Sequence, residues 1–106
     1  MKWFKKQWLR FRNWRTPPFH AHLVDDLPEI LEPCTVYLIG EEDPWQAAML
    51  CPCGCRSAIQ LSLVPNDRPR WRVSVRDGKV SLHPSVARIK GCRSHFVLFN
   101  DRIHWC

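Results

Sequence analysis

Cysteines are the first residues whose type and spacing could do chemistry. Three of them, Cys51, Cys53 and Cys55, stand within the stretch "CPCGC", and Cys92 and Cys106 follow far downstream. Cys-x-Cys is too tight for an unstrained disulfide but can chelate one ion. Gly or Pro in a turn also lets backbone N–H groups face the sulfurs. We expect these five thiols to supply the ligands of a Zn²⁺ site.

Five thiols compete for about four positions of a tetrahedron, so the choice of ligands stays open. The spare thiol could support the ligands or act as a nucleophile. His95, three residues after Cys92, could replace one sulfur. Cys34 is expected to be a small buried hydrophobic residue.

Serines and histidines near these cysteines offer a hydrolytic site. One scheme pairs Ser94 as nucleophile with His83 as base, because Ser94 and its neighbour His95 would point to opposite faces of a strand. Ser85 is a second hydroxyl, equally well explained as a turn or helix cap. A third scheme has a histidine deprotonate a zinc-bound water. Alternatively, Ser94 hydrogen-bonds a zinc-bound sulfur, and the histidines only support or complete the metal site.

The elements that must position these residues are mainly β-strands. Residues 57–64 alternate apolar and polar side chains, and Asp77-Gly78 marks a hairpin turn. Residues 21–33 are expected to be a loop or short turn. The expected strands are 34–40, 45–50, 57–64, 70–75, 79–83, 94–99 and 102–106.

These strands predict a mainly β fold, a small zinc-stapled array of β-hairpins. The cysteines of "CPCGC" would lie at one hairpin tip. The hairpin of 94–99 and 102–106 would bring Cys92 and Cys106 to the same end, where they would close the site.

Residues 1–18 are expected to form a basic amphipathic helix, followed by a zinc-binding β domain over 19–106. Aromatic side chains recur at helical spacing between lysines and arginines, and Pro17-Pro18 ends the pattern. We expect the helix to pack on its own domain or a partner. Contact with an anionic membrane surface is the alternative.

Charge and length narrow the function classes. The chain has 106 residues, enough for one domain, and a net charge of +6. Residues 1–20 carry the whole excess of positive charge, so residues 21–106 are neutral. A nucleic-acid-binding domain would normally carry the basic excess on its folded part, which counts against that function. Neither a signal-peptide pattern nor an apolar run of about 18 residues is present, which predicts the cytoplasm. There, clustered thiols more often bind metal than form disulfides.

The motifs "CPCGC", "RPRWR", "LHPSV", "GCRSHF" and "HWC" occur in this order over about residues 45–106. In this respect the sequence resembles a bacterial family known as a domain of unknown function. Genes of that family lie beside ubiquitin-like modifiers and E1-like and E2-like enzymes, in operons for antiviral defence. The resemblance implies a zinc-binding peptidase that trims or removes the modifier, with those proteins as partners. The alternative is a non-catalytic zinc adaptor that recruits the modifier or its enzymes.

Overall fold

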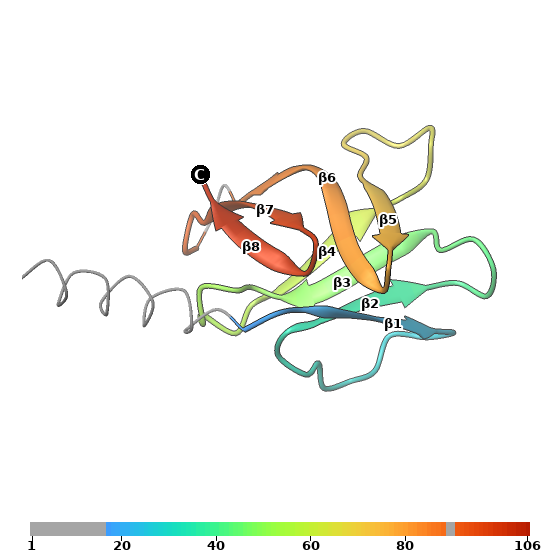
Figure 1. Cartoon of the computed structure of the whole chain (residues 1–106), viewed down its shortest axis with the longest axis horizontal. Coiled ribbons are helices and arrows are strands. Elements are labelled where there is room, and N and C mark those ends of the chain that lie inside the picture. Colours follow the sequence, from blue (N-terminus) through green and yellow to red (C-terminus); the bar gives the residue numbers. More distant parts are fainter. Residues whose placement is uncertain (1–16, 89–90) are drawn as a thin grey trace, which may run out of the picture.

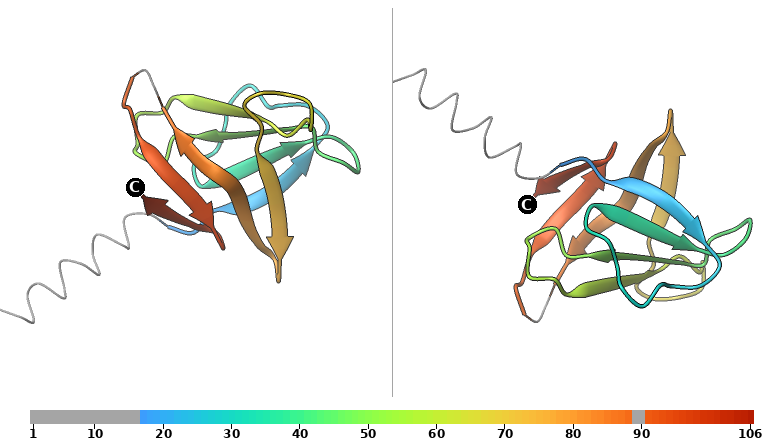
Figure 2. Two further views of the ribbon diagram at one scale, coloured as in Figure 1. Left: turned by 90° about the horizontal axis from the view of Figure 1, so that it is seen from above. Right: turned by 90° about the horizontal axis from the view of Figure 1, so that it is seen from below.

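Two four-stranded β-sheets form the part of the chain that the computed structural model describes, residues 17–88 and 91–106 (Figure 1). The first sheet has the order β1-β2-β3-β4 and the second the order β5-β6-β7-β8. Figure 2 shows that the strands of one layer cross those of the other. The strands are β1 (His20–Val24), β2 (Thr35–Ile39), β3 (Gln46–Leu50), β4 (Ala58–Ser62), β5 (Arg72–Arg76), β6 (Lys79–Ala87), β7 (His95–Phe99) and β8 (Arg102–Trp105).

The predicted array of β-hairpins is confirmed in outline. All seven expected strands occur, although β6 continues to Ala87, beyond the expected end at residue 83. Over residues 17–88 and 91–106 there is no helix, and hence none long and apolar enough to cross a membrane. The predicted N-terminal helix, and with it the division at residue 18, depends on residues 1–16, which lie outside the described residues.

Strand β1 is the element that the sequence did not predict. It pairs in parallel with β2, from His20↔Thr35 to Val24↔Ile39, across a connection that was expected to be loop. Ala21 packs against the main core, and Val24 packs against a smaller apolar cluster on the other face of the first sheet. These contacts between distant residues, rather than a local pattern, stabilise the strand.

The main core lies between the two sheets. Phe96, Met49, Leu82, Leu98, Val36 and Val80 are its largest fully buried side chains. The second cluster surrounds Tyr37 and Ile39, which Leu27 and Leu31 cover from the β1–β2 connection. Strand β2 is therefore buried on both faces, as its sequence "TVYLI" allows.

Two tight turns shape the second sheet. Asp77 and Gly78 join β5 to β6 with φ values of 53° and 76°, and Asn100 and Asp101 join β7 to β8 with 48° and 67°. Positive φ at both central residues is typical of the hairpin turn that matches the twist of the strands. Asp101 Oδ1 also accepts a 2.6 Å hydrogen bond from the Val80 N–H, which connects the two hairpins.

A bulge interrupts the pairing of β6 with β7. Leu82 pairs with Leu98 and Val86 pairs with Phe96, so three residues of β6, 83–85, face Val97 alone. A bulge bends a strand and redirects its side chains. The bulge between β6 and β7 includes Ser85.

Candidate functional site

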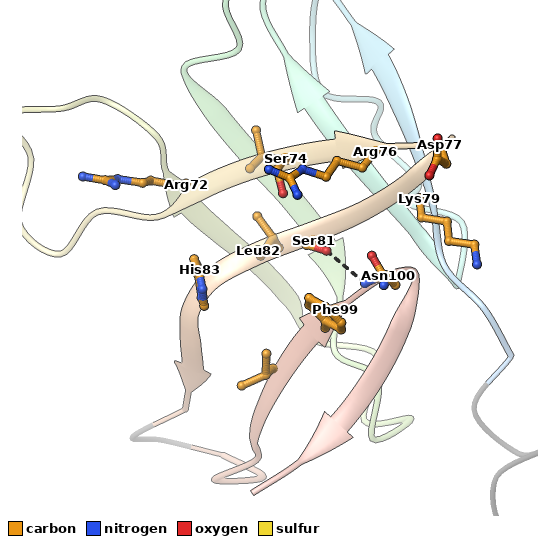
Figure 3. Close-up of a pocket in the computed structure, with 12 residues that line it drawn as sticks. Arg72, Ser74, Arg76, Asp77, Lys79, Ser81, Leu82, His83, Phe99 and Asn100 are labelled. Carbon is orange, nitrogen blue, oxygen red and sulfur yellow. Dashed lines mark hydrogen bonds between the residues drawn. The ribbon is translucent and has the colours of Figure 1, made fainter.

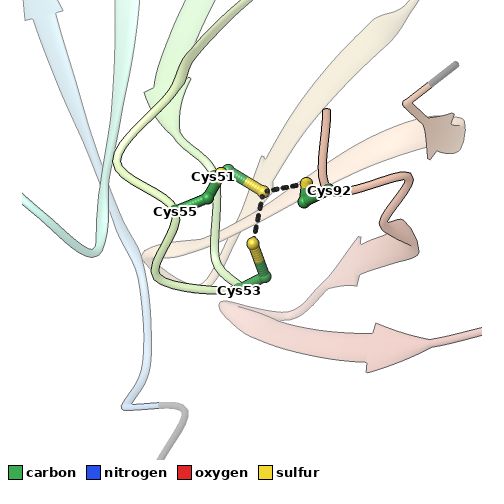
Figure 4. Close-up of side chains that lie close together, drawn as sticks. All are labelled: Cys51, Cys53, Cys55 and Cys92. Carbon is green, nitrogen blue, oxygen red and sulfur yellow. Dashed lines mark hydrogen bonds between the residues drawn. The ribbon is translucent and has the colours of Figure 1, made fainter. Parts of the chain in front are cut away.

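Four thiols meet at one end of the molecule. Cys51, Cys53 and Cys55 come from the β3–β4 turn and Cys92 from the loop before β7, with all four sulfurs within 4.8 Å of one another (Figure 4). Cys51 Sγ lies 3.3 Å from Cys53 Sγ and 3.5 Å from Cys92 Sγ. Tetrahedral coordination with Zn–S bonds of about 2.3 Å separates sulfurs by about 3.8 Å. The cluster therefore has the dimensions of a metal site with four cysteine ligands.

Two of these cysteines occupy equivalent positions. Residues 55–57 and 92–94 both read Cys-Arg-Ser, and the central Arg56 and Arg93 both adopt left-handed backbone conformations, with φ values of 64° and 53°. This conformation turns the chain back on itself, so that the serine faces the sulfur two residues earlier. The repeated tripeptide is visible in the sequence and could have identified the two positions as a pair.

The serines of the two tripeptides donate hydrogen bonds to the thiols. The Ser57 hydroxyl, helped by the Ser57 N–H, lowers the pKa of the Cys55 thiol to about 6. The Ser94 hydroxyl, 3.1 Å from Cys92 Sγ, and the Ser94 N–H lower the pKa of Cys92. Such donors stabilise thiolates, the form in which cysteine binds metal.

Cys51 differs from its three partners, which are exposed. Only 4% of its surface is accessible, and burial raises the pKa of its thiol to about 12, although the Cys53 N–H acts in the opposite direction. A buried thiol at this point connects the cluster to the main core. Metal binding would displace its proton.

Cys106 and Cys34 lie outside the four-thiol group. The Cys106 N–H donates to the His95 carbonyl at 2.9 Å, so Cys106 ends β8 opposite His95. Cys92, three residues before His95, lies instead in the loop that approaches the β3–β4 turn. The structure thus does not bring Cys92 and Cys106 together at the end of the hairpin. Cys34 packs half-buried against the core, where burial raises its pKa.

A serine and a histidine form a second centre on the outer face of the second sheet. His95 Nε2 lies 2.9 Å from Ser85 Oγ, within hydrogen-bond distance. His95 is opposite Ala87 in the β6–β7 register, and Ser85 is two residues before Ala87 on the same strand. Their side chains therefore share one face and meet diagonally across the two strands.

Backbone contacts hold this pair in place. The Trp71 indole Nε1–H donates to the Ser85 carbonyl at 3.3 Å, and the Cys106 N–H holds the His95 carbonyl. Among residues 17–88 and 91–106, no carboxylate hydrogen-bonds to His95. A hydroxyl within hydrogen-bond distance of an imidazole is the arrangement of an activated nucleophile and its base.

The structure does not join Ser94 and His83, the other pair considered from the sequence. The Ser94 hydroxyl donates to Cys92 Sγ, and His83 lies opposite Arg72 beside a groove on the second sheet. In the part of the chain described here, no hydrogen bond links the two residues. Of the four serines and histidines proposed from the sequence, Ser85 and His95 are the two that meet.

Comparison with known proteins adds one finding. A family model described as "Bacterial ubiquitination-like system serine protease (BubE)" matches residues 23–106, which include the four clustered cysteines, Ser85 and His95. Comparisons with curated proteins and with solved structures gave no match.

Proposed function

The chain belongs to the BubE family of serine proteases of bacterial ubiquitination-like systems, and we propose that it cleaves the peptide or isopeptide bond after a ubiquitin-like modifier. Ser85 is the nucleophile and His95 the general base. The observation that supports this assignment is the 2.9 Å contact between His95 Nε2 and Ser85 Oγ. Such cleavage would trim a modifier precursor or release the modifier from a conjugate.

The reaction would take two steps. In the first, His95 Nε2 accepts the Ser85 hydroxyl proton while Oγ bonds to the carbonyl carbon, and the protonated His95 then gives that proton to the leaving amine. The product is an ester between Ser85 and the modifier. In the second step, His95 takes a proton from water, the hydroxide oxygen bonds to the ester carbon, and Ser85 Oγ leaves with the proton.

This centre would work as a dyad. A carboxylate on the far nitrogen usually orients the histidine of a serine protease. Here the backbone orients both partners, because Trp71 holds the Ser85 carbonyl and Cys106 holds the His95 carbonyl. The bulge at residues 83–85 adds to this by presenting Ser85 toward β7.

The four clustered cysteines fit Zn²⁺. Cys51, Cys53, Cys55 and Cys92 lie at suitable sulfur separations, and the N–H and hydroxyl groups of Ser57 and Ser94 are aimed at the sulfurs of Cys55 and Cys92. When bound, Zn²⁺ would be a structural staple, because four thiolates fill its tetrahedron and leave no position for a reactive water. The residues that hold it would connect the β3–β4 turn to the segment that leads into β7. They would thereby fix the position of His95, the first residue of β7.

The pathway supplies the partners in this proposal. A ubiquitin-like modifier is the substrate, and E1-like and E2-like enzymes of the same system build the conjugates that the peptidase would cleave. We also propose the cytoplasm as the location, because a thiolate metal site requires reduced cysteines.

The test is a cleavage assay with the modifier of the same system, extended at its C-terminus. The intact mass of the substrate is followed, and metal content is measured on the same enzyme sample. We expect a product that ends at one defined residue. Ser85→Ala and His95→Gln should each reduce the rate by at least about a thousandfold, because removing one member of a catalytic pair removes the nucleophilic route.

His22→Gln is the matched control for the histidine variant, since His22 is exposed on β1 in the other sheet. It should keep wild-type activity. If the substrate stays intact but binds the zinc-loaded protein, the proposed peptidase activity is wrong. That result would favour a non-catalytic zinc adaptor. Full activity of Ser85→Ala would remove the assigned nucleophile.

A further inference from the structure

A groove of about 620 Å³ lies on the outer face of the second sheet, with walls from β5, β6 and β7 (Figure 3). The proposed function uses Ser85 and His95 but leaves this groove without a role. Its walls include Arg72, Arg76, Lys79 and His83. Val97 and Phe99 of β7 also line it.

The groove and the Ser85–His95 pair are continuous. His83 precedes Ser85 by two residues on β6, and Val97 follows His95 by two residues on β7. Leu82 and Val86 on either side of the bulge both face the core, so their neighbours His83 and Ser85 both lie on the outer face; in the same way Val97 shares a face with His95 on β7. One end of the groove therefore opens beside the reacting atoms.

Positively charged side chains of the groove repel one another in the protein without a ligand. Arg76 is directly opposite Lys79, and Arg72 lies on the same face of β5 as Arg76. Like charges at directly opposed positions of an antiparallel pair are destabilising. Asp77, in the turn at the far end, is the single acidic residue among those that line the groove. An anionic ligand would relieve this repulsion.

The shape of the groove indicates an extended peptide. From Lys79 to Ser85 the strand advances by less than about 20 Å, because the bulge at residues 83–85 shortens the regular rise of about 3.3 Å per residue, so the groove matches about four to six residues of an extended chain. Phe99, which lines the groove, is 54% exposed, so an apolar side chain of the ligand could cover it. An alternation of acidic and apolar side chains would meet both features.

We propose that this groove binds the acidic, extended segment of the modifier that immediately precedes the cleaved bond. This inference rests on the proposed function. The groove should bind the modifier rather than the group that leaves on cleavage, because the modifier is common to every precursor and conjugate. The group attached to the modifier varies. A groove of fixed charge suits the constant partner.

The experiment compares two substrates and three enzymes. One substrate is the extended modifier. In the other, every Glu and Asp among its last six residues before the cleaved bond is changed to Gln or Asn. The enzymes are wild type, the double variant Arg72→Gln with Arg76→Gln, and Arg68→Gln. Arg68 is an exposed cation in the β4–β5 loop and does not line the groove, so its variant is the matched control.

We expect removal of the acids to lower kcat/KM of the wild type about tenfold, mainly through KM, with a weaker effect at high salt. The double variant should lose the same factor on the acidic substrate and little more on the neutral one. Arg68→Gln should behave as the wild type. Equal kcat/KM for both substrates, or a modifier without acids in those six residues, would overturn the groove's assignment while cleavage itself stands.

Binding to the Ser85→Ala protein separates this inference from the proposed function. A fluorescent peptide of the modifier's last six residues should bind it, and the added Arg72→Gln and Arg76→Gln changes should weaken that binding about tenfold. Suppose that the wild-type protein cleaves no substrate, while the peptide still binds in this charge-dependent way. The assignment of the groove then stands, and the proposed peptidase activity is wrong. If a single-stranded oligonucleotide displaces the peptide and a polyglutamate peptide does not, the occupant is nucleic acid and the inference is wrong.

Discussion

Ser94 and His95 are consecutive residues whose side chains belong to two different centres. The Ser94 hydroxyl donates to Cys92 Sγ at 3.1 Å, whereas His95 Nε2 lies 2.9 Å from Ser85 Oγ. Ser94 ends the loop that carries Cys92 and His95 begins β7, so this one peptide joins the thiol cluster to the proposed base. Any contact that positions Ser94 beside the thiol cluster therefore also determines the position of His95.

Ser94→Ala should therefore separate the two centres. The variant loses one hydrogen bond to Cys92 Sγ, and we expect metal affinity to fall by about ten- to a hundredfold, as for other groups that support metal ligands. With zinc in excess, its cleavage rate should stay within about threefold of wild type. Competition with a zinc chelator and the cleavage assay measure the two effects. Loss of cleavage in a zinc-loaded Ser94→Ala protein would instead make Ser94 the nucleophile.

Cys92 and Cys106 provide a test of the ligand set. Cys92→Ser should lower the zinc content of purified protein and the free energy of unfolding, because a domain of this size depends on its metal for stability. Cys106→Ser should keep one zinc per chain, since Cys106 lies opposite His95 rather than in the four-thiol group. Metal analysis and urea denaturation are the measurements. A Cys106→Ser protein without zinc would return this residue to the ligand set.

Local patterns predicted most of the strands, and contacts between distant residues explain what they missed. The alternation of Ile59 and Leu61 with polar residues and the turn at Asp77-Gly78 are local signals, and both correspond to observed strands. Strand β1 has a weak pattern, exposed at His20, His22 and Leu23. It forms through its parallel pairing with β2, which depends on residues more than ten positions away.

The contact between Ser85 and His95, the proposed nucleophile and base, could not be predicted from the sequence for a similar reason. Ser85 and His95 could both be identified as residue types able to do the chemistry. Their meeting depends on the shift in β6–β7 pairing between Leu82 and Val86, and a bulge leaves no clear trace in the hydrophobic pattern. The thiols were easier to predict, because three of them are close in sequence.

Trp71 is expected to position the nucleophile. Trp71→Phe keeps an aromatic ring but removes the Nε1–H that holds the Ser85 carbonyl, which should cost about 1 kcal/mol of stability. We expect kcat to fall about tenfold with KM nearly unchanged, because Trp71 does not line the groove proposed to bind the substrate. The rate at which a fluorophosphonate modifies Ser85 should fall in parallel. A kcat equal to wild type, with only stability reduced, would limit Trp71 to a packing role.

Arg93 tests the backbone geometry of the Cys-Arg-Ser repeat. Its φ of 53° is a left-handed conformation that glycine adopts freely and that a β-branched residue adopts only with strain. Arg93→Gly should therefore keep zinc affinity and stability close to wild type, whereas Arg93→Val should destabilise the protein by about 1–3 kcal/mol. Arg93→Val should also weaken zinc binding, because the strained residue displaces the Ser94 donors from Cys92. Arg102→Val, at an exposed position of β8, is the control and should be nearly neutral. If Arg93→Val retained both properties, the left-handed turn would not be what aims Ser94 at the sulfur.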